Sequence, residues 1–132
     1  MVGVFLNFSN HPSSGWSVEQ REAAEKYGRI QDLPFPVVSA DASEEDIQEL
    51  ADVYLKKIRE YSPSAVMCQG EFTLSFAIVK ELLKAGIMCV SACSERVVQE
   101  RIAADGRAVK KSVFRFVKFR EYRMGENRNN HE

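Results

Sequence analysis

Short apolar runs alternate with amphipathic segments along the first ninety residues of the chain. Four segments lack a helical period and predict strands, at residues 2–8, 29–33, 65–68 and 87–90. The segments between them carry apolar residues at helical spacing and predict helices, at residues 17–27, 43–62 and 73–84. This alternation is typical of a mostly parallel sheet with right-handed crossovers and helices on both faces.

The last third of the chain has a different pattern. Asp105 and Gly106 separate two segments, residues 96–102 and 107–122, that predict a C-terminal antiparallel hairpin. The second segment carries apolar residues on both faces, more than an edge strand facing water needs. Spare aromatic residues on an appended hairpin commonly contact another subunit. We therefore expect a homodimer, formed through the hairpin or through the face that carries the ligand site.

Size and charge narrow the class of protein. The 132 residues predict one α/β domain over residues 1–124 and a flexible polar tail over 125–132, which includes His131. The formal net charge of -1 creates no general field that would attract a long nucleic acid or an anionic membrane. The N-terminal apolar run is too short for a signal peptide or a membrane span. Three cysteines without paired or metal-binding spacing indicate reduced, mostly buried thiols, and we expect a cytoplasmic protein.

Three of the predicted strand ends carry clustered polar residues. Ligands of an open parallel sheet bind outside the carboxyl ends of the strands, near the point where the strand order reverses. The end of the second strand, residues 34–36, is apolar. The three polar clusters predict the site, and they are Ser9-Asn10-His11, Gln69-Gly70-Glu71 and Ser94-Glu95-Arg96.

The first cluster offers proton transfer and anion binding. His11 suits a general acid or base, because histidine exchanges protons near neutral pH, or it hydrogen-bonds its own turn. Ser9 and Asn10, with Ser13 and Ser14, offer donors for a phosphate close to a helix N-terminus. Turn formation and helix capping are the alternative roles of these four residues.

The other clusters also have two interpretations each. Glu71 suits a base or a ribose acceptor, and equally the stabilisation of a helix start. Gln69 suits contact with a base or ribose, or a hydrogen bond within its loop. Arg96 suits neutralising a phosphate while Glu95 holds its guanidinium, or an exposed ion pair. Trp16 suits stacking on a base or packing of the first helix.

Several common catalytic motifs do not occur in the sequence. It contains no GxGxxG or GxxxxGK[ST] pattern, so ordinary dinucleotide and Walker-type sites are disfavoured. It also lacks a GxSxG motif, a recognisable pair of catalytic carboxylates and a metal-ligand cluster. A hydrolase with a covalent nucleophile and a metalloenzyme are therefore unsupported.

Both ends of the chain resemble a known family. Residues 4–24 (VFLNFSNHPSSGWSVEQREAA) resemble the start of the small CRISPR-associated ring nucleases, whose first strand runs into an N-F-S-H-P-like segment before a helix. Residues 112–122 (SVFRFVKFREY) resemble the C-terminal strand of that group. Asn10 is an extra residue, and this insertion would re-aim the histidine. The matching positions are Asn7, Phe8, Ser9, His11 and Pro12.

The resemblance implies a function as well as a fold. The fold would be Rossmann-like, related to the ligand-binding domains of type III CRISPR effectors. A homodimer would bind a cyclic oligoadenylate across its two-fold axis. A ribose 2′-hydroxyl would attack the adjacent phosphodiester and open the ring, without metal or cofactor. The protein would thereby switch off type III CRISPR signalling in antiviral defence.

This chemistry assigns roles to the clustered residues. A ring nuclease must orient the sugar, stabilise charge on the phosphate and move protons. On this view His11 is the acid or base, and Ser9 and Asn10 hold the phosphate. The residues expected in catalysis are His11, Glu71 and Arg96. The residues expected to contact the ligand are Asn7, Ser9, Asn10, Ser13, Ser14, Gln69, Gly70, Ser94 and Glu95.

Three other functions are compatible with the sequence. The same residues would serve a non-catalytic sensor that binds a cyclic or linear nucleotide. The aromatic hairpin would equally serve a structural domain that docks on a larger protein. Glu71 as a nucleophile would suit a nucleotide enzyme that cleaves or transfers a glycosyl bond.

Overall fold

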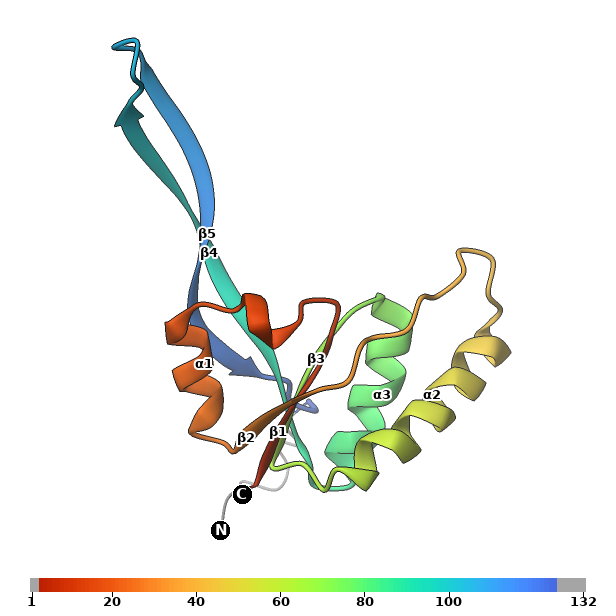
Figure 1. Ribbon diagram of the computed structural model, residues 1–132. Helices are drawn as coiled ribbons and strands as arrows, with labels where there is room; N and C mark the ends of the chain where they lie inside the picture. The colour runs from red at the N-terminus through yellow and green to blue at the C-terminus, as the bar shows by residue number, and fades with distance from the viewer. Residues whose placement is uncertain (1–2, 126–132) are drawn as a thin grey trace.

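The computed structural model describes residues 3–125 and contains one five-stranded sheet, in the order β2-β1-β3-β4-β5 (Figure 1). The strands are β1 (Val4–Ser9), β2 (Arg29–Asp32), β3 (Ala65–Gln69), β4 (Met88–Ile102) and β5 (Ala108–Glu121). The helices are α1 (Val18–Glu25), α2 (Glu44–Glu60) and α3 (Phe72–Lys84), with a short 3-10 helix, η1 (Ser13–Gly15). Strands β1 to β4 are parallel, and β5 is antiparallel to β4. The predicted α/β class and the C-terminal hairpin are confirmed.

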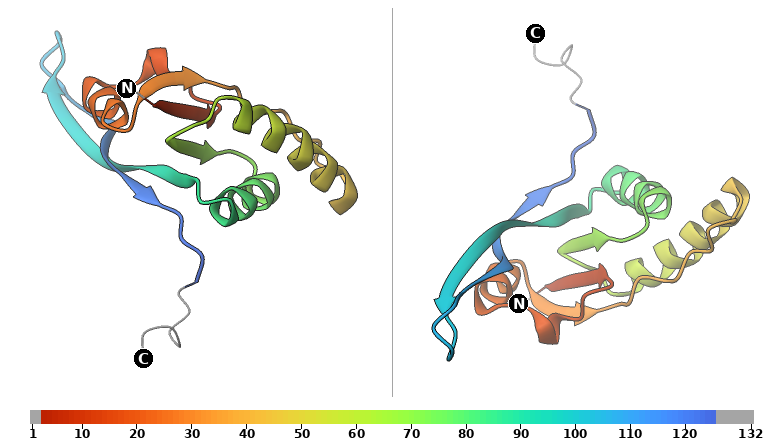
Figure 2. Two further views of the ribbon diagram at one scale, coloured as in Figure 1. Left: turned by 90° about the horizontal axis from the view of Figure 1, so that it is seen from below. Right: turned by 90° about the horizontal axis from the view of Figure 1, so that it is seen from above.

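Helices cover both faces of the sheet, because β1 carries apolar side chains on both of its faces. Phe5 packs in one core with Ala24 of α1. Leu6 and Phe8 pack in the other core with residues of α2 and α3, such as Ile78. Figure 2 shows α1 on one side of the sheet and α2 with α3 on the other. Burying a side chain as large as Phe8 stabilises the fold by roughly 1.5–3 kcal/mol.

Local sequence signals set the helix boundaries close to where they are predicted. The Ser17 hydroxyl accepts a hydrogen bond from the backbone N–H of Gln20 at 3.1 Å, at the start of α1. At the start of α2, Ser43 and Asp46 form a reciprocal capping box. Gly86 follows α3 with a φ of 79°, a left-handed conformation that commonly ends helices.

The predicted end of the fourth strand at residue 90 is wrong. β4 separates from β3 after Val90 but continues to Ile102, because β5 supplies hydrogen-bonding partners along its length. The register of β4 and β5 shifts between Cys93 and Ser94, where a bulge marks the passage from the sheet to the hairpin. Residues 94–96 therefore lie within a strand and not in a loop at the carboxyl edge of the sheet.

Beyond the bulge, the hairpin projects from the body of the protein as a two-stranded arm, residues 94–117, which we call the hairpin arm (Figure 1). The predicted turn at Asp105-Gly106 is confirmed, and Gly106 has a φ of 88°. The backbone N–H of Ala103 donates to the Arg107 carbonyl at 2.8 Å and closes the turn. The exposed large apolar residues of the arm are Val98, Ile102, Phe114 and Val117.

Aromatic contacts anchor the base of the hairpin to the body. The ring of Phe119 lies 5.0 Å from that of Phe5 and 6.4 Å from that of Trp16. Phe116 packs edge-on against Phe119, with ring centroids 4.9 Å apart. Aromatic pairs in this range add about 0.5–1.5 kcal/mol each beyond area burial. The lower part of the hairpin is therefore held against β1 and the start of α1.

Two further expectations concern the chain as a whole. Within residues 3–125, no helix is both long enough and apolar enough to cross a lipid bilayer. The flexible tail expected from the sequence lies, from residue 126 onward, outside the described residues.

Burial makes two of the three cysteines unreactive, which a thiol assay can test. Burial raises the pKa of Cys68 and of Cys89 to about 12, so both thiols stay protonated near neutral pH. Cys93 at the bulge is partly exposed. We expect Ellman's reagent at pH 8 to modify only Cys93 in the native protein and all three thiols after denaturation. Cys93→Ser should abolish the native reaction, and rapid native modification of Cys68 or Cys89 would contradict this packing.

Candidate functional site

The strand order reverses beside β1, which lies between β2 and β3. The chain continues from β1 to β2 on one side and later returns to β3 on the other. In such open sheets the crevice at this reversal, outside the carboxyl ends of the strands, is where ligands bind. Ser9 at the end of β1 pairs with Gln69 at the end of β3. The structure thus brings the first two predicted clusters together at this reversal.

Two open cavities meet at this edge, and both are lined by His11 and Gln69. One, the α3-side cavity, has a volume of about 320 Å³. It is lined by Asn10, His11, Gln69, Gly70, Phe72, Ser75, Ser91 and Tyr122. The other, the hairpin-side cavity, has a volume of about 900 Å³, and its lining includes Trp16, Ser94, Phe114, Arg115 and Phe116. Both volumes are in the range of small-molecule sites.

A buried hydrogen-bond network fixes the loop that carries His11. The side chain of Asn7 is buried, and its Nδ2 donates to the His11 carbonyl at 2.9 Å and to the Asp32 carboxylate at 3.1 Å. The Ser9 hydroxyl donates to Asn7 Oδ1 at 2.6 Å and accepts from the backbone N–H of His11 at 3.2 Å. Asn7 and Ser9 line neither cavity, so their polar atoms position His11 from below.

Asp32 and Trp16 complete the support of this loop. The Asp32 carboxylate accepts from the backbone N–H of Ser13 at 3.2 Å, and Trp16 Nε1 donates to the His11 carbonyl at 3.2 Å. The Ser13 N–H, a candidate phosphate donor, is therefore occupied by a carboxylate of the protein itself. Ser14 is exposed in η1. Asp32 is not among the predicted residues, because the segment that follows β2 is apolar and the acid lies inside the strand.

Gln69 lines both cavities, and its neighbour Gly70 lines the α3-side cavity. Gln69 Oε1 accepts from the backbone N–H of Ala92 at 2.5 Å and so extends the β3–β4 pairing beyond its backbone ladder. The amide NH₂ of Gln69 is the donor group that this bond leaves for other partners. A Cβ atom on Gly70 would lie 2.5 Å from the ring of Phe35, so glycine is required for this close approach.

Glu71 lies at the N-cap of α3 and lines neither cavity. Its carboxylate accepts from the Thr73 hydroxyl at 2.7 Å and from the backbone N–H of Leu74 at 2.8 Å. These hydrogen bonds, with Thr73 foremost, lower the pKa of Glu71. The geometry agrees with the helix-start interpretation of Glu71 rather than with contact to a ligand in either cavity.

The third predicted cluster lies on the hairpin arm. The expected support of Arg96 by Glu95 is wrong, because Glu95 pairs across the hairpin with Arg115 and forms an ion pair with it. Ser94 and Arg115 line the hairpin-side cavity, whereas Arg96 lines neither cavity. The arginine that lines the hairpin-side cavity is therefore Arg115, whose guanidinium is held by its ion pair with Glu95.

Several lining residues are not among those predicted from the sequence. Phe72, Ser75, Ser91 and Tyr122 belong to the α3-side cavity. The Tyr122 hydroxyl donates to the Cys68 carbonyl at 2.9 Å, which ties the end of the chain's last strand to β3. The helical period could have placed Ser75 one turn after Glu71. The position of Tyr122 follows only from the return of β5 along β4.

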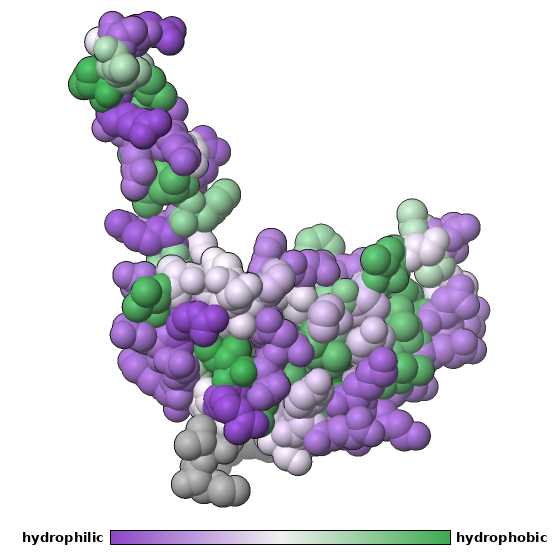
Figure 3. Space-filling model, in the orientation of Figure 1, coloured by the Kyte–Doolittle hydropathy of each residue, from purple (hydrophilic) through white to green (hydrophobic). Residues whose placement is uncertain are grey.

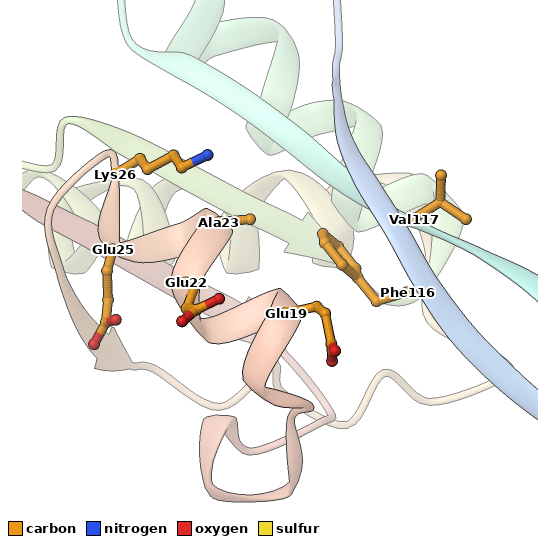
Figure 4. Close-up of a pocket in the computed structure, with 7 residues that line it drawn as sticks. All are labelled: Glu19, Glu22, Ala23, Glu25, Lys26, Phe116 and Val117. Carbon is orange, nitrogen blue, oxygen red and sulfur yellow. The ribbon is translucent and has the colours of Figure 1, made fainter.

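A third cavity of about 610 Å³ lies between α1 and β5, and we call it the α1 groove (Figure 4). Figure 4 shows Phe116 pointing from β5 toward α1. The charged residues of the groove are Glu19, Glu22, Glu25 and Lys26. Three carboxylates against one cation disfavour a phosphate here, so the α1 groove is not a candidate nucleotide site.

The groups at the two cavities define the chemistry that is available there. His11 can transfer a proton, Gln69 and the serine hydroxyls can donate hydrogen bonds, and Arg115 can neutralise an anion. Within residues 3–125, no group of three or more His, Cys, Asp or Glu side chains is placed to hold a metal ion. The arrangement therefore suits binding of an anionic organic ligand and proton transfer to it.

The role of Asn7 as a clamp can be tested by substitution. Asn7→Leu removes the amide and leaves the Ser9 hydroxyl, the Asp32 carboxylate and the His11 carbonyl with one partner fewer each. We expect a loss of roughly 2–3 kcal/mol in the free energy of unfolding, measured by urea denaturation. The control Asn10→Ala, at an exposed neighbouring position, should change it by less than about 0.5 kcal/mol. Equal effects of the two substitutions would show that the loop does not depend on the clamp.

Comparison with known proteins gives a family without a described activity. A sequence model of the uncharacterized protein MJ1673 family matches residues 3–120 of the chain. No curated protein matches the chain significantly. The matched segment includes the loop of His11, the ends of β1 and β3 and the whole hairpin arm, whereas Tyr122 lies just beyond it.

Proposed function

The chain belongs to the uncharacterized MJ1673 family, and we propose that it binds a cyclic oligoadenylate at the carboxyl edge of its sheet and opens the ring. The observation that supports this most is the position of His11 and Gln69 at the boundary of two cavities beside the strand-order reversal. The resemblance of residues 4–24 and 112–122 to ring nucleases suggests the class of ligand. In that setting the protein would end the signal of a type III CRISPR system.

The local charge of the hairpin favours an anionic ligand although the whole chain has a net charge of -1. Residues 107–120 contain six basic residues and no acidic one, so this strand creates a positive potential along the hairpin arm. Of these six, Arg115 lines the hairpin-side cavity, whose lining also includes the acidic Glu19. Glu95 holds the guanidinium of Arg115. The aromatic side chains of Trp16, Phe114 and Phe116 line the same cavity and offer faces on which bases stack.

Ring opening needs one proton-transfer group and no external reactant. The 2′-oxygen of a ribose bonds to the adjacent phosphorus while the His11 imidazole takes the proton of that hydroxyl. The bond from phosphorus to the 5′-oxygen breaks, and the leaving oxygen receives a proton from the imidazolium. The product is a linear oligoadenylate with a 2′,3′-cyclic phosphate at one end and a 5′-hydroxyl at the other. Arg115 neutralises the charge that develops on the phosphate oxygens.

The structure supports a different division of roles from the one expected from sequence. Asn7 and Ser9 are buried, so in this proposal they hold the His11 loop rather than the phosphate. Arg115 takes the role that the sequence suggests for Arg96. Glu71 caps α3.

We propose further that two copies of the chain form the functional unit through their hairpin arms. Apolar patches alternate with polar ones along the projecting arm (Figure 3). A two-stranded ribbon is marginally stable alone in water, so the arm gains stability from a partner surface. In this dimer, the basic strand β5 of one copy would face the three carboxylates in the α1 groove of the other copy. The groove also offers an apolar wall, formed by Phe116 and Val117. A two-fold dimer would present His11 twice to a ligand with repeated units.

The catalytic proposal is tested with cyclic tetra-adenylate in buffer containing EDTA. We expect linear tetra-adenylate with a 2′,3′-cyclic phosphate, which is an isomer of the substrate and is identified by its chromatographic retention and its fragments in tandem mass spectrometry. His11→Ala should slow its formation at least about 100-fold, because a general acid or base contributes 10²–10⁴-fold, while the Kd changes by less than about threefold. Binding without a linear product would indicate a sensor, and release of free adenine would indicate glycosyl-bond cleavage. Either result would contradict ring opening.

The dimer proposal is tested by light scattering on the purified protein. We expect a mass of twice the 15.0 kDa chain at micromolar concentration. Phe114→Ser should shift the equilibrium toward monomer, because it removes an exposed aromatic anchor of the arm. Val37→Ser is the matched control, since it removes an exposed apolar side chain outside the arm. A monomeric wild-type protein, or a dimer equally stable in both variants, would refute the role of the arm.

A further inference from the structure

We propose that the α3-side cavity is a base-binding subsite, in which the ring of one adenine stacks on Phe72 and hydrogen-bonds to the buried hydroxyl of Ser75. This inference rests on the proposed function for the identity of the ligand. It adds a division of the site, with a base on one side of His11 and the sugar–phosphate chain on the other.

Ser75 provides the first observation. Its side chain lines the α3-side cavity and is 8 % exposed, and its Oγ has no hydrogen-bond partner among the described residues. Its neighbour is the Cys68 thiol, whose pKa it lowers slightly against the larger effect of burial. A thiol is a weak partner, and a buried hydroxyl without a good partner costs about 1–3 kcal/mol. The Oγ atom itself is inaccessible beside this thiol, so a ligand atom in the cavity would satisfy it once the Ser75 side chain rotates about χ1 toward the cavity.

Phe72 provides a second, independent observation. It is the first residue of α3, lines the same cavity and is 89 % exposed. Phe76 lies one turn further along α3 and is also exposed, but it does not line the cavity, and Lys80 covers its ring at 5.7 Å. An aromatic ring at the rim of a polar cavity is a stacking surface for a base.

The charges around the cavity favour a base over a phosphate. Among residues 3–125, no lysine or arginine lines the α3-side cavity. The N-terminus of α3, which would otherwise attract an anion, is already capped by the Glu71 carboxylate. Arg115 lies on the other side, in the hairpin-side cavity. A neutral base therefore fits beside α3 while the phosphates lie toward the hairpin.

This arrangement places the reacting group next to His11. His11 and Gln69 line both cavities, so the ribose that connects a base to its phosphate would cross the boundary beside them. The Gln69 side chain is fixed by its bond to the Ala92 N–H, and its NH₂ group can donate to the base or the ribose. The subsite thus explains why the proton-transfer group lies between the two cavities.

The test is the Kd of cyclic tetra-adenylate, measured by isothermal titration calorimetry on the full chain carrying His11→Ala, which suppresses turnover, and on three further variants in that background. Phe72→Ala should weaken binding roughly 5- to 100-fold, as expected for loss of one stacked base. Ser75→Ala should weaken it about 3- to 10-fold while the Tm stays equal or rises, because the variant removes an unsatisfied hydroxyl. Phe76→Ala is the matched control and should bind like the His11→Ala protein. Unchanged binding by Phe72→Ala and Ser75→Ala would overturn the subsite and leave the proposed function intact.

If wild-type protein does not bind cyclic tetra-adenylate, the proposed function fails, and adenosine 5′-monophosphate tests the subsite by itself. Saturable binding of this nucleotide, weakened by Phe72→Ala but not by Phe76→Ala, would support the subsite. No saturable binding, or equal binding by both variants, would overturn it.

Discussion

The burial of β1 on both faces is the constraint from which the rest of the structure follows. Phe5 on one face and Leu6 and Phe8 on the other must all be covered, so helices pack on both sides of the sheet. To place helices on both faces, the chain adds β2 on one side of β1 and β3 on the other, so the strand order reverses beside β1. The polar side chain in the middle of this strand, Asn7, is then buried, and its hydrogen bonds must be made within the protein. Those bonds hold the loop of His11 at the reversal.

Two sets of polar side chains lie near the end of β1. One set stabilises the loop of His11, and the other set faces the cavities. Below the cavities, Asn7, Ser9 and Asp32 satisfy one another and the backbone of the loop. Above them, His11 and Gln69 reach both cavities. The hairpin then adds a cation to one cavity only. In the proposed function, this uneven charge would distinguish the base of a nucleotide from its phosphate at one edge of the sheet.

The elements and the fold class could be predicted from local patterns, whereas the strand order could not and the site could be predicted only in part. Apolar runs, helix caps and the Asp105-Gly106 turn are encoded within a few neighbouring residues, and they gave the sheet, the helices and the hairpin. The strand ends at Ser9 and Gln69 were also predictable, because parallel strands share an edge. That Arg115 rather than Arg96 lines the hairpin-side cavity could not be predicted. It depends on β4 continuing past residue 90 and on the register of β4 with β5. The register between two paired strands cannot be predicted from the spacing of residues along one of them.

The most direct test of the account is to map where cyclic tetra-adenylate contacts the protein, by NMR titration of the uniformly ¹⁵N-labelled chain. Binding at the two cavities that His11 and Gln69 share predicts amide shifts concentrated in residues 9–16, 69–75, 91–94 and 113–116. The amides of α2, which lines neither cavity, should stay unshifted. Shifts confined to α2 or to the α1 groove, or no saturable shifts at all, would contradict it.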